Sequence, residues 1–424
     1  MLDIKFIREN ANLVKESGRK KGFEVDIDAL LALDEKRREL IYESESLRAE
    51  QKRGSKELGK LKGKEKEAAL AKLKDMSDRV KGLNEELRAA EADYNGLMLR
   101  VPNVPASDVP EGTDDSQNVE IRRWGEPRKF DFEIEDHIEL GRALDIIDIP
   151  RGVKLGGTRS YFLKGDGALL ENALMQFGLD YIAKKGFTIL SGPVLVKDFA
   201  MYGTAFFPFG EEQSYRVEKD ELNLVGTSEV FVTSYHSEEI LKEEDLPLLY
   251  AALSTCFRRE AGTYGRDTKG AYRVHQFQKV EQVVLCKADE EESRRQHEFI
   301  LKNSEGILQA LNLPYRVVVC CTGDLGLGQV VKFDLEAWMP SRDSYGETNS
   351  ASRYHDFQAR RLNIRYRDGD GATHFVHTLN NTVVASTRLI IAIVENYQQA
   401  DGSIVIPEVL RPYMGGRDRI TPGS

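Results

Sequence analysis

The feature that most constrains the fold is a long proline-free stretch, residues 26–99. It is rich in Ala, Leu, Glu, Lys and Arg, which favour helix. Its second half carries apolar residues spaced alternately by three and four, the period of a stripe that faces a partner helix: Leu73, Met76, Val80, Leu83, Leu87, Ala90, Tyr94 and Leu97. Leu33, Leu40 and Leu47 form a matching stripe in the first half. Because Gly59 and Gly63 lie between the halves, where the chain can reverse, the sequence predicts an antiparallel helical hairpin, a coiled coil.

The predicted end of this hairpin is basic, although the chain has a net charge of -10. A solvated helix surface is one interpretation of such a charge run. Cations held far from the body, without aromatic residues to stack on bases, instead suit the phosphate backbone of a structured RNA, and we favour this interpretation. The residues expected to bind RNA are Arg48, Lys52, Arg53, Lys56, Lys60, Lys62 and Lys64.

The segment VPNVP, residues 101–105, ends the helical pattern and marks a linker. We therefore expect a helical arm over residues 1–105 and a second domain over residues 106–424. After the linker, short strand-like runs alternate with turns and a few helices. There is no GxGxxG, no GxxxxGK[ST] and no regular βαβ alternation. The expected fold class is α+β, with an antiparallel sheet flanked by helices.

Composition narrows the cellular context. No run reaches 18 uninterrupted apolar residues, and the N-terminus MLDIKFIREN is charged where a signal peptide needs an apolar core. A cytoplasmic protein without a membrane partner is therefore expected. The four cysteines, Cys256, Cys286, Cys320 and Cys321, form no CxxC and are interpreted as buried thiols.

The string FRREAGTYGRDTKGAYRVHQFQKVE, residues 257–281, gathers cations in this acidic chain. Its apolar flanks and glycine-containing loop predict a long antiparallel hairpin. Side chains alternate along a strand, so Arg273, Phe277 and Glu281 should share one face, as should Arg258 and Glu260 on the first strand. A surface ladder of ion pairs is the alternative, but an exposed aromatic ring argues against it. Arg for phosphate, Phe for a purine and Glu for an amine together indicate ATP and an amine-bearing substrate.

The same strings resemble a known family. FRREAG with RVHQFQKVE resembles motif 2 of the class II aminoacyl-tRNA synthetases, in the form typical of the seryl-tRNA synthetase family. TLNNTVVASTRLIIAIVENYQ resembles motif 3, and SGPVLV with Pro193 resembles motif 1. GTSEV and GETNSASRYHDFQARR are similar to two further segments of that family, in the same order. With the helical arm, the resemblance extends over nearly all of the chain and implies a C-terminal class II synthetase domain.

The resemblance implies an ATP site. Arg258 would contact the α-phosphate, Glu260 the adenine amino group and Arg273 the outer phosphates. Phe277 and Arg388 would enclose the adenine, and Arg258 and Arg388 would be the catalytic residues. Glu347 and Ser350 would hold Mg²⁺. Secondary contacts are assigned to Arg259, Val274, Thr348 and Asn349.

The resemblance also implies a serine site. Thr227, Glu229 and Glu281 would receive the ammonium group and backbone, with Arg258 nearby. Thr382 and Asn380 would meet the hydroxyl, and Ser228 would add a main-chain contact. Arg266 and Lys269, in the loop of the motif 2 hairpin, would meet the acceptor end of the tRNA.

The implied activity is ATP-dependent charging of tRNA(Ser) with L-serine by a homodimer, with tRNA(Sec) left open as a further acceptor. Serine's carboxylate would attack the α-phosphorus in line, so the protein needs to position two reactants and neutralise negative charge. Two alternatives remain. One is a paralogue that activates an amino acid for a non-tRNA acceptor, and the other is a non-catalytic RNA-binding descendant. Retention of the arm argues against the first, and retention of Arg258, Glu347 and Arg388 against the second.

Overall fold

The computed structural model describes residues 1–262 and 269–422. The chain divides into two compact units, which we describe separately. One comprises residues 2–19 and 23–102, and the other comprises Met1 with residues 20–22 and 103–424. None of the helices in the described ranges is long and apolar enough to cross a bilayer.

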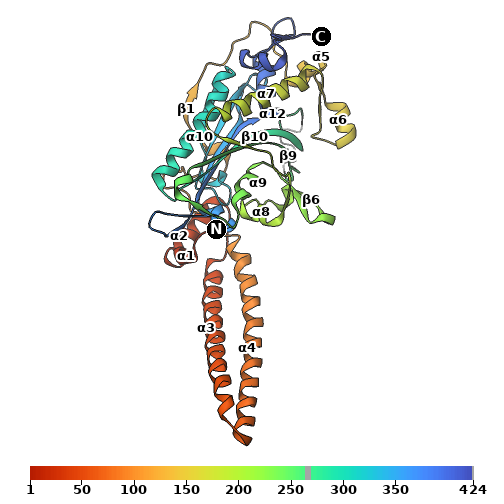
Figure 1. The fold of residues 1–424 in the computed structure, drawn as a ribbon. Helices are drawn as coiled ribbons and strands as arrows, with labels where there is room; N and C mark the ends of the chain where they lie inside the picture. Colours follow the sequence, from red (N-terminus) through yellow and green to blue (C-terminus); the bar gives the residue numbers. More distant parts are fainter. Residues whose placement is uncertain (263–268, 423–424) are drawn as a thin grey trace. The chain divides into compact units, whose positions relative to one another are not determined.

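The helical unit is dominated by two long antiparallel helices, α3 (Ile27–Glu57) and α4 (Gly63–Met98), joined by the short 3₁₀ turn Leu58–Lys60 (Figure 1). Two short helices precede them, α1 (Ile4–Glu9) and α2 (Ala11–Lys21). The Asp26 side chain accepts a hydrogen bond from the Ala29 amide and so caps the start of α3. The predicted helical hairpin is confirmed, with its reversal in the glycine-containing segment between the two long helices.

The predicted apolar seam forms the contact between α3 and α4. Leu40, Leu83 and Ala90 are buried together, with Leu47 and Leu87 packed against them. Polar contacts interrupt the seam beside this cluster, where the Asn84 side-chain oxygen accepts hydrogen bonds from Ser44 and Arg48 at 3.3 and 3.0 Å. Because a polar pair in an apolar seam is satisfied only in one alignment, these contacts favour a single register of the two helices.

The larger unit is built on an eight-stranded sheet with the order β1-β11-β12-β13-β16-β10-β9-β4. The neighbouring strands are antiparallel except β4 and β9, which are parallel. The bounds are β1 Val119–Trp124, β4 Thr188–Leu190, β9 Leu248–Phe257, β10 Gln276–Cys286, β11 Tyr315–Val319, β12 Val331–Met339, β13 Ser344–His355 and β16 His377–Ala385. The expected α+β class is therefore confirmed.

Alternation along the central strand β10 separates two cores. Val280 and Val284 belong to a cluster formed with three long helices on one face of the sheet, α7 (Asp166–Ala183), α10 (Glu290–Ala310) and α12 (Ser386–Asn396). Val283 and Leu285 belong to a second cluster, formed with α8 (Asp198–Gly203), α9 (Glu229–Thr233) and α11 (Phe357–Leu362). The odd-numbered side chains of Val283 and Leu285 thus lie on the face away from the three long helices.

Smaller elements surround this sheet. Helices α5 (His137–Ala143) and α6 (Ile149–Gly156) follow β1. The minor strands are β2 Ile147–Asp148, β3 Phe162–Leu163, β5 Leu195–Lys197, β6 Tyr215–Val217, β7 Leu222–Leu224, β8 Ile240–Lys242, β14 Arg365–Arg367, β15 Thr373–Phe375, β17 Ile404–Val405 and β18 Arg419–Ile420. All four cysteines are buried thiols, as expected.

The predicted motif 2 hairpin is confirmed as a β9–β10 pair, but its strands are shorter than expected. The placement of Arg258, Glu260 and Arg273 on strand faces is wrong, because β9 ends at Phe257 and β10 begins at Gln276. The Arg258 amide still donates across the hairpin to the His275 carbonyl at 2.9 Å, but the ladder goes no further, because the amide of His275 donates to the carbonyl of Arg159. Beyond it Glu260 has a left-handed backbone with φ 52°, which no regular strand can contain.

Candidate active site

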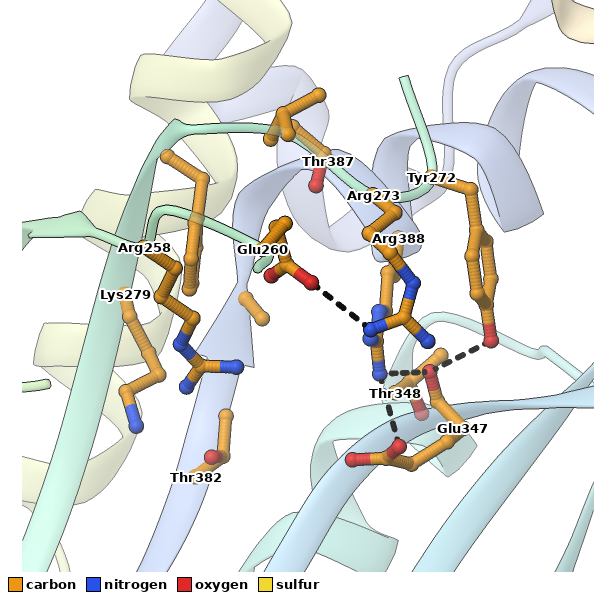
Figure 2. A pocket seen from close by; sticks show the side chains of 13 residues that line it. Arg258, Glu260, Tyr272, Arg273, Lys279, Glu347, Thr348, Thr382, Thr387 and Arg388 are labelled. Atoms are coloured by element: carbon orange, nitrogen blue, oxygen red, sulfur yellow. Dashed lines mark hydrogen bonds and ion pairs between the residues drawn. The ribbon is translucent and has the colours of Figure 1, made fainter. Parts of the chain in front are cut away.

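A pocket lies where the irregular end of the β9–β10 hairpin meets β13 and the junction of β16 with α12 (Figure 2). Nine of the residues proposed from sequence line it: Arg258, Glu260, Arg273, Val274, Phe277, Glu347, Thr348, Thr382 and Arg388. Four further residues line it to which no role was assigned from the sequence: Tyr272, Lys279, Ala385 and Thr387. Segments separated by more than a hundred positions in the sequence thus supply one cation-rich cavity.

Arg388, in the first turn of α12, is fixed by Glu347 of β13. Its Nη1 lies 3.0 Å from the Glu347 carbonyl oxygen and 3.1 Å from the Oε2 carboxylate oxygen. Tyr272 donates to the same carbonyl at 3.2 Å, and the Arg388 guanidinium lies over its ring, 4.7 Å from the centroid (Figure 2). Burial alone would raise the pKa of Glu347, but Arg388 and Lys332 hold it below its ordinary value. This carboxylate therefore stays ionised beside two cations.

Arg258 and Phe277 form a second pair in the pocket. The Arg258 guanidinium lies 5.1 Å from the centroid of the Phe277 ring, a cation–π contact, and its Nε donates to the Gly226 carbonyl at 3.3 Å. Phe277 is thus covered by Arg258, while Arg388 lies over Tyr272. Phe277 and Arg388 both line the pocket, and a flat ligand would have to insert between these two pairs to contact both.

Glu260 and Arg273 are paired with each other at the pocket wall. Arg273 Nη1 donates to Glu260 Oε2 at 3.0 Å, and both side chains are largely buried (Figure 2). Each also has other interactions. Their pairing places one acceptor and one forked donor at the same wall, which suits the amino group and the phosphates of a nucleotide respectively.

The two residues proposed to hold Mg²⁺ lie on the same strand. Ser350 of β13 pairs in register with Asp334 of β12, and Glu347 lies three positions before it. Asp334 is buried, and its Oδ1 has no well-formed hydrogen bond among the described residues. A carboxylate, a hydroxyl and an incompletely bonded carboxylate are all oxygen donors, which is the chemistry that Mg²⁺ requires, so the residues present fit the ion.

A second group of possible metal ligands, Cys320, Asp324 and Asp334, surrounds a lysine. Lys332 Nζ lies 3.0 Å from Asp324 Oδ2 and 3.4 Å from Asp334 Oδ2. Because the ammonium already supplies positive charge at the centre of this group, the ion-pair role explains it without a metal.

The residues proposed to bind the substrate serine lie partly at the pocket wall and partly in a buried layer behind it. Glu281 of β10 is 2% exposed, and its Oε2 accepts a hydrogen bond from Thr382 of β16 at 3.0 Å. The same oxygen lies 2.5 Å from the Nζ of Lys279. Lys279 and Thr382 line the pocket, so Glu281 lies directly behind the pocket wall and is bonded to two of its side chains.

Glu229, at the start of α9, forms the layer behind. It accepts a hydrogen bond from Gln358 Nε2 at 2.9 Å, and the Asn380 side chain donates to the nearby Tyr354 hydroxyl at 3.4 Å. Burial, reinforced by the negative charge of Glu281, raises the pKa of Glu229 to about 7. This carboxyl is therefore poised to change its protonation state near neutral pH.

The remaining proposed residues have structural contacts. Thr227 Oγ1 accepts from the Glu229 amide, and Ser228 Oγ donates to the Ala252 carbonyl. Asn349 is buried and donates to the carbonyls of Thr382 and Val383, so it braces β16 and does not face the pocket. The Arg259 amide donates to the Gln213 carbonyl. Arg266 lies outside the described residues, and Lys269 is exposed. The seven basic residues proposed at the arm's end are all exposed.

Of the four pocket residues to which no role was assigned, Lys279 is the one that strand alternation places in the site. It lies between Phe277 and Glu281 at the same odd-numbered phase of β10 and so shares their face, although no ligand was assigned to it from the sequence. Tyr272 and Thr387 carried no such signal, because they lie outside the strands and reach the pocket only through the tertiary fold.

Sequence comparisons assign both parts of the chain. Residues 213–397 match the family described as tRNA synthetase class II core domain (G, H, P, S and T). Residues 1–105 match the family described as Seryl-tRNA synthetase N-terminal domain. The serine–tRNA ligase of Deinococcus radiodurans is 46% identical over 418 residues, 99% of this chain and 98% of that protein. That of Caldanaerobacter subterraneus is 48% identical over 418 residues, 98% of each.

Solved structures agree. The crystal structure of seryl-tRNA synthetase from Pyrococcus horikoshii complexed with ATP superposes with a TM-score of 0.92 at 40% identity, covering 100% of both chains. The cytoplasmic serine–tRNA ligase from Naegleria fowleri in complex with AMP gives a TM-score of 0.87 at 32% identity, covering 100% of this chain and 99% of that one. These findings confirm the resemblance seen in the motifs, and the chain belongs to the seryl-tRNA synthetase family.

Proposed function

We propose that this chain activates L-serine with ATP to seryl-adenylate and transfers the seryl group to the 3′ end of tRNA(Ser). The observation that carries the proposal is one cavity in which Arg258 and Arg388 lie beside a buried Glu281–Thr382 pair. The two arginines suit polyphosphate, and the carboxylate–hydroxyl pair suits a small amine that bears a hydroxyl. The full-length relatives named as serine–tRNA ligases, and the similar structure titled as an ATP complex, support it.

In the first step a serine carboxylate oxygen attacks the α-phosphorus of ATP, a new P–O bond forms, and the bond to the departing pyrophosphate breaks. Arg258 would contact the α-phosphate as its negative charge is redistributed. Arg273 would hold the outer phosphates, and Arg388 would lie on the adenine. The residues bind and orient, and no protein nucleophile is needed.

Glu347 and Ser350 would hold Mg²⁺, with Asp334 beside them. When bound, the ion supplies positive charge that screens the phosphate oxygens. The protein contributes the Arg388 contact that fixes Glu347 in place and keeps its carboxylate ionised.

In the second step the terminal ribose hydroxyl of the tRNA attacks the seryl carbonyl carbon, an ester bond forms, and AMP leaves. Serine would be preferred over alanine because its hydroxyl would bond to the buried polar side chains of Thr382 and Asn380, a contact that a methyl group cannot make. Glu229 and Thr227 would complete the surroundings of the ammonium group.

The proposal divides the chain into a tRNA-binding arm over residues 1–105 and a catalytic domain over residues 106–424. The exposed cations between Arg48 and Lys64 would contact the tRNA backbone, and Lys269 its acceptor end. A homodimer that pairs through the motif 1 segment, use of tRNA(Sec) as a second acceptor, and action in the cytoplasm complete the proposal as further expectations.

The test is serine-dependent ATP–pyrophosphate exchange, followed by charging of total tRNA with labelled serine. Exchange with serine should exceed exchange with alanine, glycine or threonine, and charging should follow it. Exchange without charging by the intact chain would favour the paralogue that serves a non-tRNA acceptor. Absence of exchange in folded protein would overturn the enzyme assignment.

A further inference from the structure

Lys279 is a buried cation in the amino acid side of the pocket that the family motifs did not lead us to assign. Its side chain is 7% exposed, and its Nζ lies 2.5 Å from Glu281 Oε2. It nevertheless lines the pocket, together with Arg258 and Thr382. In Figure 2 Lys279 and Arg258 both extend into the cavity from its β9–β10 side.

A buried ion pair of this kind adds little to the free energy of folding. Removing both charges from water costs several kcal/mol, roughly what their attraction returns. Glu281 is also already bonded by Thr382, so it does not need the lysine for a partner. A function in ligand binding explains this buried charge better than packing does.

The pair has the charge pattern opposite to that of an α-amino acid. Such a molecule carries an ammonium and a carboxylate on one carbon, so its two charges lie as close together as those of Lys279 and Glu281. An amino acid bound antiparallel to the pair would place its ammonium against Glu281 and its carboxylate against Lys279. Arg258 lies over Phe277 and donates through Nε to the Gly226 carbonyl, and it is already assigned to the α-phosphate.

We propose that Lys279 binds the carboxylate of the substrate amino acid and aims it at the α-phosphorus, while Glu281 receives the ammonium. The inference rests on the proposed serine activation and adds a substrate-binding residue to it. The ammonium would hold one carboxylate oxygen as the other forms the bond to phosphorus. Its hold would weaken as the carboxylate becomes the neutral acyl group of the adenylate.

The test compares L-serine with L-serinamide, which keeps the ammonium and the hydroxyl but replaces the carboxylate by a neutral amide. Lys279→Met should raise the KM for serine in pyrophosphate exchange by about 10- to 100-fold, the range for losing one charge-assisted contact. The KM for ATP should change by less than about threefold, because its expected partners are other residues. Serinamide, as a competitive inhibitor, should bind K279M within about threefold of wild type or more tightly.

The ratio of the two changes decides the matter. If serine and serinamide weaken by the same factor, Lys279 only supports Glu281, and the proposal is overturned. Lys279→Arg, which keeps the charge, should retain most of the preference for serine over serinamide. Lys287→Met is the matched control, because Lys287 follows the same strand and pairs with Glu243 at the surface, and both affinities should stay unchanged.

A measurement on the wild type covers the case in which K279M does not fold. By calorimetry the intact chain should bind serine at least about tenfold more tightly than serinamide, and equal affinities would overturn the proposal. If the wild type shows no serine-dependent exchange at all, it is the proposed function that fails.

Discussion

The Arg388 side chain contacts both the main chain and the side chain of Glu347: its Nη1 lies 3.0 Å from the Glu347 carbonyl oxygen and 3.1 Å from Glu347 Oε2. One guanidinium therefore fixes both the course of β13 at this point and the direction of the carboxylate. The arginine comes from α12 and the glutamate from a neighbouring part of the sheet, so the contact ties motif 3 to the proposed Mg²⁺ ligand. Loss of the arginine should disturb nucleotide and ion positions together.

Arg388→Ala should lower kcat for pyrophosphate exchange by about 100-fold or more, as expected when a donor positioned for transition-state charge is removed. Arg388→Lys should recover little, since an ammonium cannot both stack on a ring and reach two oxygens. Arg342→Ala is a suitable control, because Arg342 also lies over Tyr272 but does not line the pocket. If R342A and R388A lose activity equally, support of Tyr272 would explain the effect instead.

Thr382→Val keeps the shape of the side chain and removes the hydroxyl that donates to Glu281. We expect the KM for serine to rise and the preference for serine over alanine in exchange to fall by about tenfold, since a buried polar partner is lost. Competing exchange assays with the two amino acids measure the preference. Thr387→Val, in a residue that lines the pocket away from the Glu281 pair, should leave it unchanged, and an equal fall in T387V would contradict the assignment.

Glu229 gives the stability of this chain a pH dependence of known sign. Burial and Glu281 raise its pKa to about 7 from an ordinary value of 4.5. Between those values the folded chain holds a proton that the unfolded chain has released, so this group's contribution to the free energy of unfolding falls as pH rises. Above about pH 7 the contribution is constant.

Glu229→Gln removes this titration. The free energy of unfolding of E229Q minus that of wild type should therefore rise as pH increases from about 4.5 to about 7 and then level off. Denaturant melts at several pH values measure it, and parallel curves for the two proteins would show that Glu229 does not titrate in this window. Because a bound ammonium favours the ionised carboxylate, serine binding near pH 6.5 should also release protons, detectable by calorimetry in buffers of different ionisation enthalpy.

Periodic features were predictable from the sequence because they depend on spacing alone. The seam through Leu83 and Ala90 follows from a 3.5-residue period, and the shared face of Phe277 and Glu281 follows from strand alternation. The point where the β9–β10 ladder ends could not be predicted from the sequence. It depends on the carbonyl of Arg159, in a distant part of the chain, which accepts a hydrogen bond from the His275 amide.

The contacts inside the site could not be predicted well from the sequence either, because they also depend on residues from distant parts of the chain. The motifs named Arg258, Arg388 and Glu347 as ligand-binding groups, but their partners are set by long-range packing. Gln358 reaches Glu229 across 129 positions, and this contact together with burial determines how that carboxyl behaves. Tyr272 carries two guanidiniums, Arg342 and Arg388, although nothing in its local sequence marks it.

The basic end of the arm should act on tRNA and not on activation. Changing Lys52, Arg53, Lys56 and Lys60 together to Glu should raise the KM for tRNA in charging by at least about 10-fold, because each lost phosphate contact removes counterion release. Serine-dependent pyrophosphate exchange should stay within about twofold of wild type, since these side chains are exposed on the helical unit and none lines the pocket. Charging by the variant should also depend less steeply on salt concentration.

A matched variant separates this effect from general loss of charge. Lys36, Arg79, Lys81 and Arg88 are exposed cations on the same helical hairpin, farther from the turn that joins α3 to α4. Changing these four to Glu alters net charge by the same amount, so a long-range electrostatic effect would weaken both variants equally. A local contact between the end of the arm and the tRNA requires the first variant to lose much more. Equal losses, or unchanged charging in the first variant, would leave the exposed cations as a solvated surface and place tRNA recognition elsewhere in the chain.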